Sequence, residues 1–299
     1  MNLAVEKNIT EDAFAYFEDL LSKKGPEIEE FSPLNELINF LYEAKDEELT
    51  QLVRQRLVSI YHLDTIMGWM FKKPYGYAGD FKIIDMIYQH KVSSNPAYFR
   101  WDIFVNNQVA SKAVRNRKTY FKNLLLKKTL EHKGMLKILN LASGPARDLY
   151  EFFEENPNAE IHCTCVELDS HAIEFAKDLL QDHLDKVTFI NKNIFRFQTQ
   201  EKYDLIWSAG LFDYFEDKVF VRLLSRLKNN LANNGEIVIG NFHPRNETRP
   251  MMELLGDWYL NHRTKDELTQ LADEAGIVKG CIKIEAEPEG INLFMRMAQ

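Results

Sequence analysis

The chain has 299 residues, of which 45% are hydrophobic and 27% are charged, and its formal net charge is -8. This composition is typical of a globular protein with one large or two modest domains, and no apolar run approaches the roughly 20 residues that a membrane-spanning helix needs. The acidic balance argues against a nucleic-acid substrate, because surfaces that follow phosphates are usually basic.

Apolar residues in the first part of the chain, residues 1–132, recur at the spacing of helices. Polar side chains that can cap a helix precede several of the apolar stripes. The expected helices begin near Thr10 and near Ser32, run over Asp46–Trp69, begin after Asp80, and run over Pro96–His132 with one break. We therefore predict an all-helical domain over residues 1–132, which would act as a lid and bind the substrate.

Strands alternate with helices over residues 133–299. The expected strands are Leu136–Leu141, Ile161–Glu167, Val187–Ile190, Tyr203–Ala209 and Glu236–Asn241, with a terminal hairpin of Ile282–Ala286 and Ile291–Arg296. The expected helices begin near Ala146 and run over His171–His183 and Val219–Leu231. Short apolar strands separated by helices predict an α/β fold, a parallel sheet with helices on both faces. A seven-stranded Rossmann-like sheet closed by an antiparallel hairpin is the class I methyltransferase arrangement.

Small or polar residues follow the strands at the edge where such sheets bind ligands. Glu167 ends the second strand, where a carboxylate can accept hydrogen bonds from both hydroxyls of a ribose. Asn193 follows the third strand, at the height expected for an adenine amino group. The candidate cofactor-binding residues are Ala142, Ser143, Gly144, Arg147, Glu167, Leu168, Asn193, Ile194, Ser208 and Gly210.

The loop after the first strand carries alanine at two positions where phosphate-binding loops usually carry glycine, Ala142 and Ala146. S-adenosylmethionine has an amino-acid tail in place of a pyrophosphate, so its loop does not need two glycines against phosphate oxygens. Gly144 keeps one close backbone approach, and the helix N-terminus behind it favours a carboxylate. The loop, Glu167, Asn193 and the hairpin together predict an S-adenosylmethionine site.

Four segments carry a resemblance to a known family: "GYAGDF" (Gly76–Phe81), "SGPARD" (Ser143–Asp148), "SAGLFDYF" (Ser208–Phe215) and "DWYLNHRT" (Asp257–Thr264). The chain resembles the bacterial class I methyltransferases grouped with the extracellular-factor 3-hydroxypalmitic acid methyl ester synthases, over most of its length from about residue 70. The resemblance implies methylation with S-adenosylmethionine, with a fatty-acid carboxylate as the acceptor. Asn140 departs from the acid that many methyltransferases place at this position.

Candidate catalytic residues stand in three segments. Tyr77 lies in the "GYAGD" segment, which we interpret as part of a lid or, alternatively, as a turn in which Asp80 caps a helix. Asp213 and Tyr214 follow the fourth strand and would contact the acceptor or the sulfonium, or else cap and pack the next helix. His243 follows the fifth strand and would be a base or an acceptor contact. A carboxylate acceptor is already ionised at pH 7 and needs no base, whereas a hydroxyl or a protonated amine needs one.

The densest basic stretch and the cysteines allow weaker inferences. The stretch is a solvated helix face or a docking surface for an acyl carrier protein or a coenzyme A ester, and consists of Arg115, Arg117, Lys118, Lys122, Lys127 and Lys128. Arg263 is expected to pack against the helical half of the chain or, alternatively, to contact an anion. The three cysteines are expected to be reduced and the protein cytoplasmic, since the N-terminus lacks the order of a secretory signal. No set of ligands for a metal stands out.

Two other functions remain open at this point. The acceptor could be a hydroxyl or an amine of a natural product, on the same fold. A regulator that binds S-adenosylmethionine without turnover is also compatible with the loop. A dehydrogenase that uses NAD would share the loop and Glu167 but would not need the terminal hairpin.

Overall fold

The computed structural model describes residues 3–298, with side chains from Glu11 onward, and its contacts divide the chain into two compact units. The helical unit is the chain up to Lys112 together with Glu247–Tyr259, and the sheet unit is Ala113–Asn246 together with the residues from Leu260 onward. Within residues 3–298, none of the helices combines the length and the apolar character that crossing a membrane requires.

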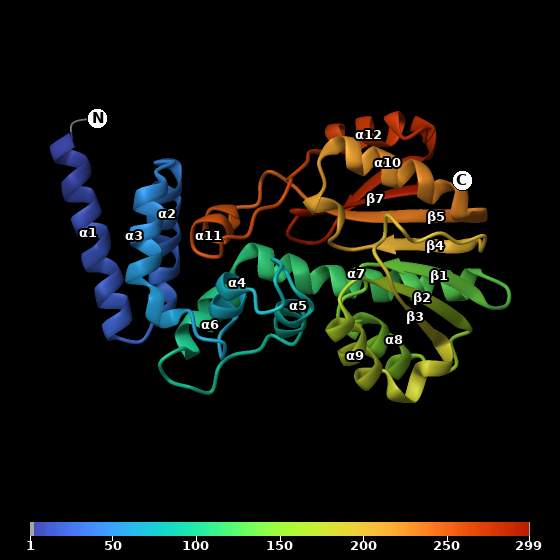
Figure 1. Ribbon diagram of the computed structural model, residues 1–299, viewed down its shortest axis with the longest axis horizontal. Coiled ribbons are helices and arrows are strands. Elements are labelled where there is room, and N and C mark those ends of the chain that lie inside the picture. Colours follow the sequence, from blue (N-terminus) through green and yellow to red (C-terminus); the bar gives the residue numbers. More distant parts are fainter. Residues whose placement is uncertain (1–2, 299) are drawn as a thin grey trace. The chain divides into compact units, whose positions relative to one another are not determined.

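The helical unit is built from short helices with polar caps (Figure 1). Asp80 caps one of them, since its Oδ1 accepts hydrogen bonds from the N–H groups of Lys82 and Ile83 at 2.9 Å each, as its sequence position predicts. The helices are α1 (Leu3–Ser22), α2 (Phe31–Glu43), α3 (Glu47–Arg56), α4 (Ile66–Lys72), α5 (Phe81–Tyr88), α6 (Phe99–Asn107), the start of α7 (Val109–Glu131) and α11 (Arg249–Leu254).

Two of the expected helix boundaries in this unit are wrong. Helix α1 begins at Leu3, so Thr10 lies inside it and does not cap it. The helix expected over Asp46–Trp69 is interrupted between α3 and α4, where the Thr65 hydroxyl caps α4 by accepting from the N–H of Gly68 at 2.8 Å. The apolar spacing continues across this interruption, which is why periodicity alone did not reveal it. The break expected between Pro96 and His132 is confirmed by α6 and α7.

Polar contacts join the late segment Glu247–Tyr259 to the early helices of the same unit. The buried Arg54 guanidinium donates from Nε to the carbonyl of Leu254 at 2.7 Å and from Nη2 to that of Glu253 at 2.9 Å. The Tyr42 hydroxyl donates to a carboxylate oxygen of Glu253 at 2.8 Å. The ammonium of Lys73 reaches both the carbonyl and the carboxylate of Asp257. The helical unit is therefore assembled from two stretches of chain that are distant in sequence.

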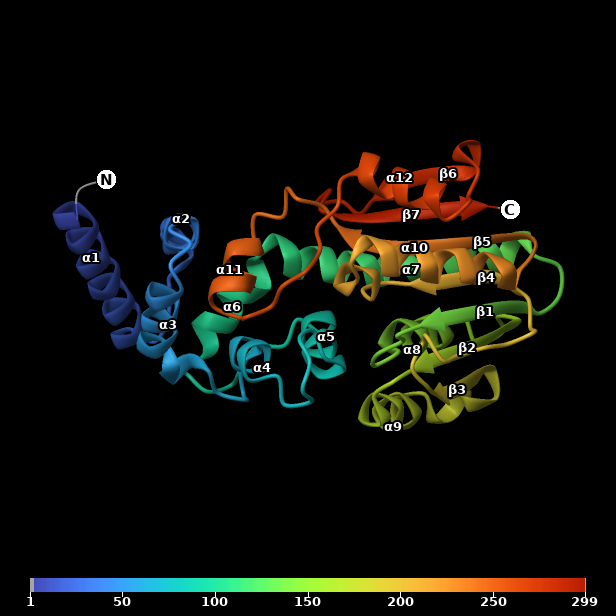
Figure 2. The same cartoon turned by 45° about the horizontal axis from the view of Figure 1, so that its top comes forward.

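The sheet unit has the expected α/β architecture (Figures 1 and 2). In the described part of the chain its sheet has the order β3-β2-β1-β4-β5-β7-β6, in which β7 runs antiparallel to both of its neighbours. The strands are β1 (Leu136–Leu141), β2 (Ile161–Glu167), β3 (Val187–Asn191), β4 (Tyr203–Ser208), β5 (Leu231–Phe242), β6 (Ile282–Ala286) and β7 (Asn292–Ala298). The helices are the rest of α7, α8 (Arg147–Glu155), α9 (Ser170–Leu179), α10 (Asp217–Leu227) and α12 (Lys265–Glu274). This is the predicted class I methyltransferase sheet with its terminal hairpin.

Two predicted helices of the sheet unit end too late. Helix α10 stops at Leu227, and Leu231, expected at the end of that helix, pairs with Tyr203 as the first residue of β5. Helix α9 stops at Leu179 and a 3-10 segment follows it. At Leu231 a single apolar residue fits either a helix face or a buried strand, so the local pattern does not decide between them.

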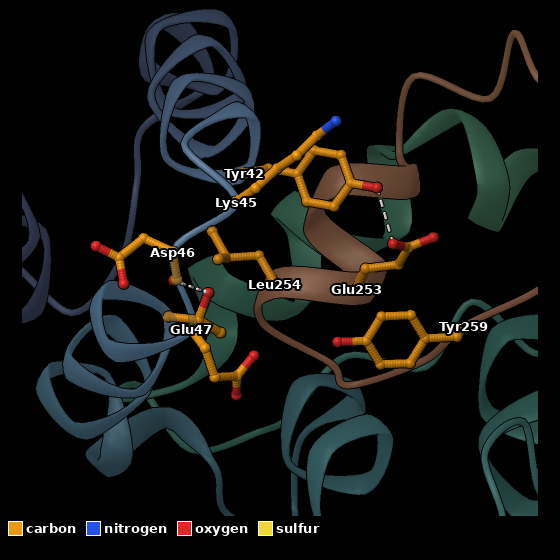
Figure 3. A pocket seen from close by; sticks show the side chains of 8 residues that line it. Tyr42, Lys45, Asp46, Glu47, Glu253, Leu254 and Tyr259 are labelled. Carbon is orange, nitrogen blue, oxygen red and sulfur yellow. Dashed lines mark hydrogen bonds between the residues drawn. The ribbon is translucent and has the colours of Figure 1, made fainter. Parts of the chain in front are cut away.

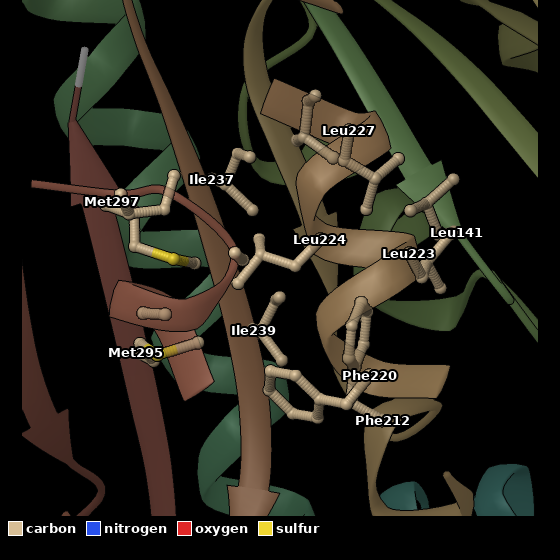
Figure 4. Close-up of a cluster of buried hydrophobic side chains, with 14 of the residues drawn as sticks. Leu141, Phe212, Phe220, Leu223, Leu224, Leu227, Ile237, Ile239, Met295 and Met297 are labelled. Atoms are coloured by element: carbon tan, nitrogen blue, oxygen red, sulfur yellow. The ribbon is translucent and has the colours of Figure 1, made fainter. Parts of the chain in front are cut away.

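Each face of the sheet carries its own apolar core. Helices α10 and α12 cover one face, where Phe220 and Leu224 pack against Ile237, Ile239 and the hairpin methionines (Figure 4). Helices α7, α8 and α9 cover the other face. The carboxyl ends of β1, β2, β3 and β4 lie at one edge between these two layers, where α/β sheets bind their ligands.

The second half of α7 belongs to the core of the sheet unit. Phe121 and Leu125 are fully buried there, and Phe121 stacks on Trp207 of β4 with ring centroids 4.4 Å apart. The division of the chain therefore differs from the one expected at residue 132. Contacts place the end of the first helical stretch at Lys112 and return Glu247–Tyr259 to the helical unit.

Candidate functional site

The loop between β1 and α8 has an alternating left-handed backbone. Ala142, Gly144 and Ala146 have φ angles of 52°, 56° and 49°. This conformation costs an L-residue about 1–2 kcal/mol, so two alanines hold it against an intrinsic preference. A Cβ built on Gly144 would meet nothing within 4 Å, so the space beside its backbone is open. The loop thus leaves its backbone accessible beside Gly144, at the carboxyl end of β1.

Two buried serines lie at the carboxyl ends of neighbouring strands, Ser143 after β1 and Ser208 at the end of β4. The Ser143 hydroxyl is buried and has no hydrogen-bond partner within the described residues. A buried hydroxyl without a partner is unfavourable, so this atom is a candidate for a ligand contact. Ser208, at the end of β4, is also buried, but its hydroxyl donates to the carbonyl of Leu141 at 3.3 Å. Arg147 is the first residue of α8 and is half-buried.

Glu167 links the loop to the end of β2. One carboxylate oxygen accepts from the N–H of Gly144 at 2.9 Å, and the other accepts from the N–H groups of Leu168 and Asp169 at 2.7 and 3.0 Å. Burial raises the pKa of the Glu167 carboxyl above its usual range, against the lowering effect of these three bonds. Oε2 accepts one of these bonds and keeps a lone pair for a further donor such as a ribose hydroxyl, whereas Oε1 already accepts two. Leu168, directly after it, is 64% exposed.

The residues after β3 continue this edge. Asn191, paired with Glu167 across the strands, donates from its amide to the carbonyl of Leu168 at 2.8 Å. The Asn193 side-chain oxygen accepts from the N–H of Phe195 at 2.8 Å, which holds the turn. Ile194 is buried in the apolar core, so only its backbone is suited to contact a ligand. Bonds and strand pairing thus bring Gly144, Glu167 and the β3 end together.

These groups fit the cofactor expected from the sequence. The orphaned Ser143 hydroxyl, the open space beside Gly144 and the remaining acceptor capacity of Glu167 are features that a bound nucleoside with an amino-acid tail would use. When bound, S-adenosylmethionine supplies an electrophilic methyl group, and the chain's own residues supply its position.

Asp213 and Tyr214 lie in a 3-10 turn after β4. The Asp213 carboxylate is buried and accepts from the N–H of Phe242 at 2.7 Å, while its carbonyl accepts from the N–H of Asn261 at 2.7 Å. Burial raises the pKa of Asp213 to about 7, against the lowering effect of the Phe242 bond and of Arg117 and Arg263. Tyr214 is 39% exposed. Asp213 therefore ties its own turn to the end of β5.

Arg263 is engaged by the protein itself. Its buried guanidinium donates to the carbonyl of Phe212 at 3.2 Å, to the side-chain oxygen of Asn241 at 2.9 Å and to the carboxylate of Asp217 at 3.0 Å, and it also reaches the carbonyl of Phe215. The expected packing against the helical half is wrong for Arg263, because its partners all lie in the sheet unit, and its anion contact is the carboxylate of Asp217. The "DWYLNHRT" segment thereby fixes the turn that presents Asp213.

His243 lies just beyond β5 and is half-buried. Its Nδ1 accepts from the N–H of Arg245 at 3.1 Å. Burial, and then the charges of Arg245 and Lys265, lowers the pKa of His243. A neutral ring whose Nδ1 accepts a bond carries its proton on Nε2, so Nε2 is a donor in this arrangement.

The basic stretch on α7 is not simply a solvated face. Lys118 and Lys122 each pair with Glu151 of α8, at 2.6 and 3.2 Å, and Lys128 pairs with Glu236 at 2.9 Å. Arg117 is buried, with 7% of its surface exposed.

Sequence reasoning did not predict that Arg117 is buried. Arg117 is spaced by four residues from Ala113 and from Phe121, both fully buried on the same stripe of the helix. A charged residue inside an apolar stripe was the signal that could have identified it.

Tyr77 belongs to the helical unit. It is 38% exposed, and its hydroxyl oxygen accepts from the N–H of Phe81 at 3.4 Å, in the segment that Asp80 caps. A separate pocket of about 270 Å³ lies in this unit (Figure 3). It holds none of the predicted site residues. Its lining mixes polar and apolar side chains and consists of Tyr42, Lys45, Asp46, Glu47, Thr50, Glu253, Leu254 and Tyr259.

The described residues hold no group of histidines, cysteines and carboxylates that could bind a metal ion. Cys163 and Cys165 are free and buried with their sulfurs 3.7 Å apart, and Cys281 is free and exposed.

Comparisons with known proteins agree with the fold. A model of the methyltransferase domain family matches residues 132–281. No curated protein matches the chain. A possible exported protein from Bordetella parapertussis is similar in structure, with a TM-score of 0.62 and 17% identity over 74% of this chain and 79% of that chain.

Two further solved structures share the fold. A candidate O-methyltransferase from Nostoc punctiforme PCC 73102 has a TM-score of 0.51 and 18% identity over 64% of this chain and 58% of its own. Magnesium protoporphyrin IX methyltransferase from Synechocystis PCC 6803, with bound S-adenosylhomocysteine, has a TM-score of 0.50 and 10% identity over 64% of this chain and 86% of its own.

The family model covers half of the chain, and the strand order and terminal hairpin are those of the class I fold. The chain therefore belongs to the methyltransferase domain family and is an enzyme of the class I, S-adenosylmethionine-dependent type.

Proposed function

We propose that this methyltransferase acts on a small-molecule acceptor and methylates the carboxylate of a fatty-acyl-type compound, forming a methyl ester. In this proposal Ser143, Gly144 and Glu167 contact the cofactor, and the other residues predicted from the same strand ends complete its site. Tyr77 and Tyr214 act on the acceptor side, and the helical unit shelters the acyl chain. The motifs "GYAGDF" and "SAGLFDYF" support this acceptor through their resemblance to the methyl ester synthases.

The state of His243 is the observation that carries the carboxylate proposal. Its Nδ1 accepts a backbone N–H and its Nε2 holds a proton, so neither nitrogen is arranged as a base. A carboxylate is the acceptor class that needs no base, since it is ionised at neutral pH. Holding the acceptor oxygen in line with the methyl carbon and away from water then supplies most of the rate.

A hydroxyl acceptor is the second candidate, and Asp213 supports it. Burial raises the pKa of this carboxyl to about 7, close to the ideal value for a general base at neutral pH. We rank it second because Asp213 is almost fully buried and one of its oxygens already holds the N–H of Phe242.

We leave a carrier-protein partner out of the proposal. Lys118, Lys122 and Lys128, half of the basic stretch that would dock it, are paired with glutamates of the sheet unit.

Transfer of label from methyl-labelled S-adenosylmethionine tests the proposal. Purified protein is incubated with palmitate or a 3-hydroxy fatty acid, and the product is treated with mild alkali. We expect label in the fatty acid that alkali releases as methanol. Alkali-stable label on hydroxyl or amine compounds would instead support the second candidate, and failure to label any acceptor, with cofactor still bound, would favour a regulator.

A further inference from the structure

A buried charged cluster lies at the carboxyl end of β4 in the sheet unit. Arg117 comes from α7, Asp148 from the first turn of α8 and Asp213 from the turn after β4, and all three are at most 7% exposed. A Cβ built on Gly210 would lie 2.8 Å from Nη1 of Arg117, so the guanidinium reaches the segment that follows β4. Three elements thus bring one cation and two carboxyls to the predicted cofactor edge.

The cluster combines positively and negatively ionisable side chains that are all buried away from water. Burial raises the pKa of Asp148 to about 6 and of Asp213 to about 7, while Arg117 lowers both. Burying charges is costly unless each finds an opposite partner, so such groups are rarely kept for stability alone. The ligand that complements a guanidinium beside carboxyls is a zwitterion, with a carboxylate for the former and an ammonium for the latter.

The amino-acid end of S-adenosylmethionine is such a zwitterion. We propose that Arg117 binds the carboxylate of this amino-acid end. This inference rests on the cofactor of the proposed function and is independent of the acceptor.

Two nucleoside ligands separate this role from a structural one. S-adenosylhomocysteine has the amino-acid end, whereas 5′-methylthioadenosine keeps the adenosine and the thioether but lacks it. Affinities are measured by calorimetry for the full chain and for Arg117→Met, with Lys122→Met as the matched control. Lys122 lies on the same helix and pairs with Glu151 and Glu155. Thermal unfolding checks that each variant is folded.

We expect Arg117→Met to bind S-adenosylhomocysteine about 10- to 100-fold more weakly, the usual effect of losing a bond between charged groups. Its affinity for 5′-methylthioadenosine should be unchanged, and Lys122→Met should bind both ligands as the original protein does. Equal weakening of both ligands, or no weakening, would overturn the proposal. Full S-adenosylhomocysteine affinity with a raised KM for palmitate would also overturn it, because Arg117 would then hold the acceptor's carboxylate.

A second variant keeps the test decisive if Arg117→Met does not fold. Arg117→Lys retains the charge but not the forked donors, so it should lose part of the S-adenosylhomocysteine affinity and none of that for 5′-methylthioadenosine. An original protein that binds 5′-methylthioadenosine no more weakly than S-adenosylhomocysteine would refute the amino-acid contact while leaving the adenosine site intact. Binding of neither ligand would refute the cofactor assignment itself.

Discussion

Glu167 offers the sharpest test of the cofactor edge, because its carboxylate holds the loop as well as the expected ribose. In Glu167→Ala the N–H groups of Gly144, Leu168 and Asp169 lose their acceptor. Leu168 is exposed, so water can replace its bond, but the Gly144 N–H lies in a partly buried loop. A buried donor left without a partner costs about 1–3 kcal/mol, so we expect a loss of that size in the free energy of unfolding.

We also expect Glu167→Ala to bind S-adenosylhomocysteine more weakly than its loss in free energy of unfolding alone would explain. Losing a ribose hydroxyl bond to a carboxylate acceptor costs on the order of 1.5–3 kcal/mol, which is roughly a 10- to 100-fold rise in Kd. Calorimetry measures it, well below the unfolding temperature of the variant. Asp169→Ala is the control, because it removes the cap of α9 at a cost of about 1 kcal/mol and leaves the ribose acceptor in place. Unchanged affinity in Glu167→Ala would remove this residue from the site.

Further predictions concern the loop, the buried acid, the buried arginine and the helical unit. Gly144→Val should fold less stably and bind no S-adenosylhomocysteine in calorimetry, since a branched side chain at positive φ is strained and fills the open space; near-normal binding would contradict it. Folding raises the pKa of Asp213 to about 7, so the folded state loses stability as the pH rises from about 4 to 7. The melting temperature of Asp213→Asn, relative to that of the original protein, should therefore increase over the same pH range. A difference in melting temperature that stays constant with pH would refute the raised pKa. Arg263→Met should lower the free energy of unfolding by about 1–3 kcal/mol in denaturant titration, because it leaves the buried carbonyl of Phe212 and the side-chain oxygen of Asn241 without their donor; an unchanged free energy of unfolding would contradict this role. Tyr77→Phe should reduce turnover in the labelling assay with no change in melting temperature, and full turnover would count against its role on the acceptor side.

The strands of the sheet could be predicted because their boundaries follow from short-range patterns of apolar and polar residues. Strands β1 and β2 begin and end at the predicted residues, since a strand buried on both faces is a short apolar run bounded by polar turns. The position of Glu167 followed from the same pattern. The strand start at Leu231 did not, because its pairing with Tyr203 is a contact between distant segments that no local pattern displays.

The sequence reasoning was weaker wherever a charged side chain meets a distant partner. Arg263 and Arg117 look like ordinary basic residues on helical segments, and only the fold shows that each is buried. The helical periodicity of α7 continues unchanged beyond Lys112. It therefore does not show that the second half of this helix, with Phe121, packs on the sheet. A chain truncated near Leu130 would therefore lose part of the sheet's core along with the helical unit.

The two-stretch composition of the helical unit has a consequence for synthesis. Arg54 needs the carbonyls of Glu253 and Leu254, so the unit cannot be completed until the ribosome has delivered residues near the end of the chain. At roughly 5–20 residues per second, the intervening Ala113–Asn246 takes on the order of 7–30 s to emerge. By the end of that interval strands β1–β5 have emerged, whereas the early helices still lack the segment Glu247–Tyr259 that completes their unit. The buried Arg54 guanidinium therefore has neither of its two carbonyl acceptors until the inserted sheet has been synthesised.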